Sequence, residues 1–147
     1  MKLNARSIAL CAVLTALALG LSTLENLFPV TLVVPLPGVK LGLANIVTVF
    51  ALYELGAVPA LTILTARCLL GGLFAGNLSA LLFSLLGGIT AMLVMIVLRR
   101  CRGLSIYGVS IGGAAAHNIG QMAAAVITLG STMVLGYLPF LLALSLF

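Results

Sequence analysis

Charged side chains are scarce in this sequence, and their scarcity limits the folds that the chain can form. Of its 147 residues, only 6% are charged and 63% are hydrophobic. Soluble domains contain about 25% charged and about 45–50% apolar residues, and a domain of this size leaves about a third of its surface exposed. A soluble fold could not bury so much apolar surface. We therefore expect one transmembrane domain, over residues 1–147, with lipid around most of it.

Uncharged stretches and the breaks between them predict the helices. The first stretch follows Arg6 and extends from residue 7 to 24, close to the roughly 20 residues that cross a bilayer. A cleaved signal peptide, with Ala16-Leu17-Ala18 before its cleavage site, is less favoured because such peptides usually have shorter apolar cores. Further helices are predicted over 41–55, 57–73, 78–98 and 105–129, with a sixth from residue 137.

Prolines and glycines mark the breaks between these helices. The segment Pro29–Lys40 contains three prolines and should interrupt or end a helix. Turns are predicted at Gly71, Gly72, Gly76 and Asn77, and again over 130–136. Residues 136–147 would extend only about 18 Å as a helix, against about 30 Å of hydrocarbon, so we expect a truncated sixth helix. The predicted fold class is an all-α integral membrane protein with five to six transmembrane helices.

The basic residues predict how the chain is oriented. If the N-terminus is cytoplasmic, the loops after the second and fourth helices are cytoplasmic as well. Five basic residues then lie inside and Lys40 lies outside, which is the bias typical of bacterial inner-membrane proteins. The five are Lys2, Arg6, Arg99, Arg100 and Arg102. The net charge of +5 therefore indicates orientation in the cytoplasmic membrane, and we predict no nucleic-acid partner.

Small residues repeat along one face of the first predicted helix. They are Ala5, Ala9, Ala12, Ala16 and Gly20. At 100° per residue they share one narrow face, and such flat faces let helices approach closely in lipid. The face could pack inside the chain's own bundle or against a partner membrane subunit.

The fifth predicted helix has two contrasting faces. Gly108, Gly112, Ala116 and Gly120 form a second ridge for close packing. Roughly opposite, Ser110, His117, Asn118 and Gln121 form a polar face, on which His117 and Gln121 are neighbours at i and i+4. Polar side chains at membrane depth usually face a cavity or a partner group. They could bind a ligand or only join helices by hydrogen bonds.

Arg67 lies in the middle of the third predicted helix, where a charge needs a partner or water. Glu25 is the expected protein partner, because Glu54 should lie at the opposite surface. Alternatively, the guanidinium binds an anionic group of a ligand. Asn45 and Asn26 are further polar candidates. Together these residues suggest a polar pocket that opens from the outer half of the membrane.

Several kinds of chemistry are poorly supported by the sequence. The only acidic residues are Glu25 and Glu54, although many mechanisms need paired carboxylates or carboxylate-held Mg²⁺. The three cysteines are far apart and imply neither a disulfide framework nor a metal site. No P-loop and no dinucleotide-binding motif is present. We expect no cofactor, no metal and no catalytic residue.

Short motifs along the chain nevertheless indicate a family. They are Pro37–Thr48 (PGVKLGLANIVT), Arg67–Gly71 (RCLLG), Phe83–Gly88 (FSLLGG), Gly108–Ala114 (GVSIGGA), His117–Gln121 (HNIGQ) and Tyr137–Pro139 (YLP). Together they resemble the family usually named heptaprenyl diphosphate synthase component I or Gx transporter, across essentially the whole chain. The chain departs from that family at its C-terminus, where members continue through a full sixth helix.

The two names of this family imply different functions. Prenyl-elongating synthases use aspartate-rich D-D-x-x-D motifs, which a chain without Asp cannot contain, so we expect no enzyme activity. The transporter name implies similarity to the S components of energy-coupling-factor uptake systems. Those six-helix proteins bind vitamins or related molecules from the outer face. They dock on a transmembrane coupling subunit, served by two ATPases, through an A-x-x-x-A face like Ala5/Ala9 and Ala12/Ala16.

The sequence therefore predicts the substrate-binding subunit of a bacterial uptake transporter for a small vitamin-like, isoprenoid or flavin-related molecule. Its ligand would contact Asn45, Arg67, His117, Asn118 and Gln121, with Glu25 and Lys40 nearby and the Pro29–Lys40 segment as a cap. The alternative is a non-catalytic membrane subunit of a prenyl diphosphate or quinone synthesis assembly, or of an extracellular electron-transfer assembly.

Overall fold

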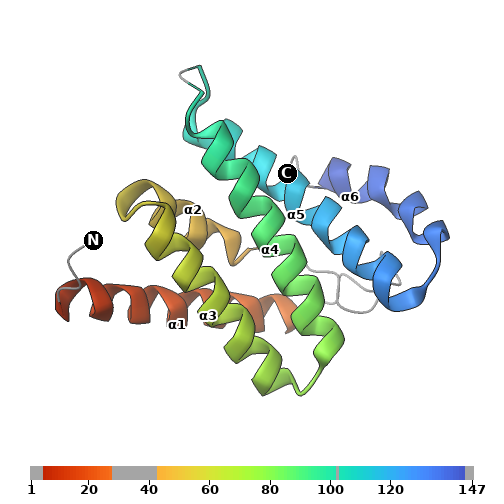
Figure 1. The fold of residues 1–147 in the computed structure, drawn as a ribbon, viewed down its shortest axis with the longest axis horizontal. Helices are drawn as coiled ribbons and strands as arrows, with labels where there is room; N and C mark the ends of the chain where they lie inside the picture. Colours follow the sequence, from red (N-terminus) through yellow and green to blue (C-terminus); the bar gives the residue numbers. More distant parts are fainter. Residues whose placement is uncertain (1–4, 28–42, 102, 145–147) are drawn as a thin grey trace.

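The computed structural model of the protein describes residues 5–27, 43–101 and 103–144, and these residues are helical apart from short connections (Figure 1). Six α-helices occur in this part of the chain, with one 3₁₀ helix before the last. The helices are α1 (Ala5–Leu27), α2 (Asn45–Glu54), α3 (Ala57–Ala75), α4 (Leu78–Leu98), α5 (Ile106–Leu129), η2 (Thr132–Tyr137) and α6 (Leu138–Leu144). The predicted all-α class is confirmed.

Three of these helices are long and apolar enough to cross a membrane. Their spans are Ala5–Glu25, Ala57–Ala75 and Leu78–Leu98. Helix α5 is longer than α3 but is not among them, because His117, Asn118 and Gln121 lower its hydropathy. Large apolar side chains such as Leu73 and Phe74 are exposed on the helix surfaces, as expected where lipid is the solvent. The chain is therefore a multi-pass membrane protein.

Local side chains and glycines determine where these helices begin and end. The Asn77 side chain accepts hydrogen bonds from Ser79 N and Ala80 N at the start of α4, a common helix cap. Gly76 and Gly130 have φ of +59° and +63° directly after α3 and α5, a conformation that favours glycine. The turn predicted at Gly71 and Gly72 is wrong, since α3 continues to Ala75.

Helices α4 and α5 lie side by side and approach each other closely (Figure 1). A Cβ added at Gly120 would lie 2.5 Å from Leu86 O and 2.8 Å from Gly87 Cα, and one at Gly112 would overlap Leu98 Cδ1. In the same interface, the Thr90 hydroxyl donates to Ala116 O over 3.0 Å. The ridge predicted on the fifth helix therefore packs against α4 through Gly112, Ala116 and Gly120.

Helix α1 packs on α3 and α2 and contacts no other described helix. Its buried face contains Leu14, Ala18 and Glu25. The predicted small-residue stripe lies on the opposite face, where Ala5, Ala9, Ala12, Ala16 and Gly20 are all exposed. Packing of this stripe inside the described part of the bundle is thus excluded, and the stripe faces outward.

Arg99, directly after α4, connects that helix to the end of α2. Its guanidinium donates to Leu52 O and, over 3.4 Å, to Tyr53 O. It also lies 5.0 Å from the centroid of the Tyr53 ring. The carbonyls at a helix C-terminus carry partial negative charge and lack intrahelical partners. The C-terminal ends of α2 and α4 therefore lie at the same end of the molecule.

Candidate ligand-binding site

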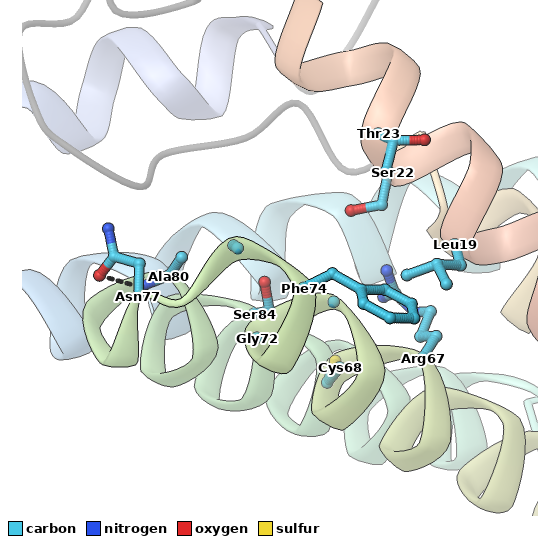
Figure 2. Close-up of a pocket in the computed structure, with 12 residues that line it drawn as sticks. Leu19, Ser22, Thr23, Arg67, Cys68, Gly72, Phe74, Asn77, Ala80 and Ser84 are labelled. Atoms are coloured by element: carbon cyan, nitrogen blue, oxygen red, sulfur yellow. Dashed lines mark hydrogen bonds between the residues drawn. The ribbon is translucent and has the colours of Figure 1, made fainter.

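A cavity of about 410 Å³ lies where the second half of α1 meets the end of α3 and the start of α4 (Figure 2). This volume falls within the range of about 300–1,000 Å³ that is usual for ligand pockets. Its lining residues come from these three helices and from the connection between α3 and α4: Leu19, Ser22, Thr23, Arg67, Cys68, Gly71, Gly72, Phe74, Ala75, Asn77, Ala80 and Ser84. The cavity contains Arg67, one of the predicted site residues.

The Arg67 side chain is the main polar group of the cavity and is only 7% exposed. Its Nη2 donates to Asn45 Oδ1 over 3.1 Å. The carboxylate of Glu25, which is 3% exposed, interacts electrostatically with the guanidinium. The structure thus brings together Arg67, Asn45 and Glu25 from α3, α2 and α1. A buried charge in a membrane protein requires partners of this kind.

One donor of Arg67 is not used by this network. Its Nε is buried and makes no hydrogen bond with the described residues. A buried donor without an acceptor costs about 1–3 kcal/mol, and more on a charged group. Arg67 also lines the cavity, so its guanidinium is the charged group that a bound molecule would meet there.

Spacing along α3 and small side chains leave the cavity open. Arg67, Gly71 and Ala75 lie four residues apart and therefore on one face of the helix. A Cβ added at Gly71 would meet only Leu19 Cδ1, at 3.5 Å, so the backbone of α3 itself forms part of the wall. In Figure 2 the Arg67 side chain lies beside the Phe74 ring, with Leu19 of α1 across from it.

The polar residues of α5 form a separate group. The His117 Nε2 and Gln121 Nε2 atoms are 3.0 Å apart and hydrogen-bonded, which confirms that these two side chains are neighbours. Asn118 Nδ2 donates to Leu141 O of α6 over 2.7 Å. A Cβ at Gly87 of α4 would lie 2.8 Å from His117 Cε1, so the absence of a side chain there leaves room for the imidazole.

The predicted site residues therefore fall into two groups rather than one pocket. Arg67 lines the cavity, Asn45 is hydrogen-bonded to it, and Glu25 interacts with it electrostatically. In contrast, His117, Asn118 and Gln121 are not among the lining residues. Helix α4 lies between α3 and α5 (Figure 1), and α1 does not contact α5. Lys40 and the Pro29–Lys40 cap lie outside the described residues.

Sequence reasoning missed several residues of this cavity. The hydroxyls of Ser22, Thr23 and Ser84 and the Phe74 ring line it. Ser84 lies in the family motif Phe83–Gly88, but no motif or spacing distinguishes the other three from their neighbours. A search for i, i+4 neighbours of Arg67 would have found Gly71. Within the described part of the chain, no group of three or more His, Cys, Asp or Glu residues could hold a metal ion.

Comparison with known proteins agrees with the motifs in the sequence. The family model of heptaprenyl diphosphate synthase component I matches residues 14–147. No curated protein and no solved structure matches the chain significantly. The match begins within α1 and includes every later described helix and both groups of polar residues. The chain therefore belongs to the heptaprenyl diphosphate synthase component I family.

Proposed function

We propose that this membrane protein is the substrate-binding subunit of a bacterial uptake transporter, similar to the S components of energy-coupling-factor systems. The observation that carries the proposal is the cavity lined by Arg67, a buried charged side chain whose Nε has no acceptor among the described residues. Its ligand is a small vitamin-like, isoprenoid or flavin-related molecule, and the bundle is the S-component-like fold.

The position of the cavity supports binding from outside the cell. Its walls come from the end of α3 and the start of α4. Arg99 and Arg100 lie at the other end of α4, the end that the positive-inside rule assigns to the cytoplasm. With the N-terminus in the cytoplasm, the cavity lies in the outer half of the membrane.

The exposed face of α1 supports a membrane partner. Ala9, Ala12 and Ala16 point away from the face that packs on α3 and α2. Small side chains allow another helix to approach closely. We propose that a transmembrane coupling subunit with its ATPases docks there.

The proposal includes no catalytic role for this chain. A synthase that transfers prenyl diphosphates needs acidic side chains to hold Mg²⁺ on the diphosphate, and here the only acids are Glu25 and Glu54. Glu25 is buried beside Arg67. The word "synthase" in the family description therefore fits an accessory component better than a catalyst.

The alternative is a non-catalytic membrane subunit of a prenyl diphosphate or quinone synthesis assembly, or of an extracellular electron-transfer assembly. The family description favours the first of these. The exposed face of α1 would suit a partner of either kind. In that case the Arg67 network would only stabilise the helices, and the cavity would hold no ligand.

Affinity purification from the native membrane distinguishes these functions. Mass spectrometry should identify the coupling subunit, its two ATPases and a retained small molecule. The double variant Ala9→Leu/Ala16→Leu should lose the partner but remain folded, because both positions are exposed. Leu17→Phe, at an exposed position outside the stripe, is the matched control and should keep the partner. A synthesis or redox partner without a retained ligand would establish the alternative instead.

A further inference from the structure

We propose that the cavity recognises its ligand through an anionic oxygen group, a carboxylate or a phosphate, that accepts a hydrogen bond from the Arg67 guanidinium. This inference rests on the proposed function for the presence of a ligand in the cavity. It adds the chemical class of that ligand and the residue that selects it.

The first step is the geometry of Arg67. Its Nη2 is used by Asn45 Oδ1, whereas Nε makes no hydrogen bond with the described residues. The side chain is 7% exposed and lines the cavity. An anion in the cavity would therefore lie beside a guanidinium whose donors the described residues use only in part.

The second step is the choice of acceptor. Hydrogen bonds from a guanidinium to a carboxylate or phosphate are about twice as strong as bonds between neutral groups, and the guanidinium fork matches the geometry of both anions. Glu25 already balances part of the charge on Arg67. A ligand with one anionic group therefore fits better than one with several.

The third step is the remainder of the wall. On α4, the hydroxyl of Ser84 can donate to another oxygen of the anion. Leu19 and Phe74 form an apolar surface beside Arg67 (Figure 2). The cavity thus suits a compact apolar or aromatic body with a single acidic group.

Three small probes test this class directly. Benzoate and phenyl phosphate carry an anionic group on a benzene ring, and benzamide has nearly the shape of benzoate without its charge. With purified protein in detergent, benzoate or phenyl phosphate should raise the thermal unfolding midpoint and benzamide should not. Arg67→Gln should weaken binding of the anionic probe by about 10-fold to 100-fold.

Two further variants keep the test decisive. Ser84→Ala should weaken binding of the anionic probe with little effect on folding. If Arg67→Gln does not fold, Ser84→Ala serves as the cavity variant in its place. Arg100→Gln removes an exposed arginine away from the cavity and should leave binding unchanged. Equal binding of benzoate and benzamide, no binding of either anion, or undiminished binding by both cavity variants would overturn the inference.

The binding test with these probes can succeed or fail independently of the purification experiment that tests the proposed function. Anion binding at Arg67 without a co-purifying coupling subunit would support the inference and count against the transporter. A co-purifying coupling subunit with a retained neutral molecule would support the transporter and overturn the anionic class.

Discussion

Arg67 joins three helices through two side chains at the base of the cavity. Asn45 of α2 accepts from Nη2, and Glu25 of α1 supplies a compensating charge. Replacing Asn45 by Leu, which removes the acceptor but keeps similar bulk, leaves a second buried donor without a partner. We expect Asn45→Leu to lower the free energy of unfolding by about 1–3 kcal/mol, measured by titration with dodecyl sulfate in mixed micelles.

The control for this prediction is Thr62→Ala. Thr62 is exposed and its hydroxyl bonds only to Val58 O of its own helix, so we expect a change within about 0.5 kcal/mol. If Asn45→Leu and Thr62→Ala lower the free energy of unfolding by the same small amount, the Arg67–Asn45 hydrogen bond contributes nothing to stability.

Arg99 and Arg100 are neighbours in sequence with different surroundings. The Arg99 guanidinium satisfies carbonyls at the end of α2 and lies over the Tyr53 ring, and Arg100 is exposed. We expect Arg99→Gln to destabilise the protein by about 1 kcal/mol, from the lost helix-terminus and ring interactions. Arg100→Gln should be close to neutral in the same unfolding titration. If Arg100→Gln destabilises the protein more than Arg99→Gln does, the contact of Arg99 with the end of α2 does not contribute as argued.

The α4–α5 interface depends on glycine at a position where backbones almost touch. A Cβ at Gly120 would press on Leu86 O and Gly87 Cα, which are backbone atoms that cannot rotate away. We expect Gly120→Ala to cost about 1–3 kcal/mol through overpacking. Gly20→Ala is the matched control, because nothing lies within 4 Å of its added Cβ. It should be neutral or stabilising by up to about 1 kcal/mol, and a cost similar to that of Gly120→Ala would refute the argument.

Most helix ends were predictable because their causes are local. Gly76 and Gly130 end α3 and α5 where the sequence predicted turns. Gly71 and Gly72 carried the same local signal but lie inside α3, because their small size serves packing: a Cβ at Gly72 would lie 2.8 Å from Leu81 Cβ on α4. Sequence alone does not distinguish a glycine that ends a helix from one that admits a neighbouring helix.

At the scale of the whole molecule, the arrangement of helices decides which polar residues meet. The pairing of His117 with Gln121 was predictable from their spacing, and Glu25 was the expected partner of Arg67. The separation of these two groups was not predictable, since it depends on α1 packing against α3 rather than α5. That arrangement also places the cavity at the end of the molecule where α4 begins and Arg99 at the end where α4 finishes.

The orientation of α4 therefore decides which compartment the cavity faces, and Cys101 reports it. This exposed thiol directly follows Arg100, close after the end of α4. In a Cys11→Ala/Cys68→Ala background, a membrane-impermeant maleimide should leave Cys101 unlabelled in intact cells and label it in inverted vesicles. Leu78→Cys with Cys101→Ser, at the exposed start of α4, should give the reverse. If Cys101 reacts in intact cells, the cavity opens toward the cytoplasm, and uptake by binding from outside is ruled out.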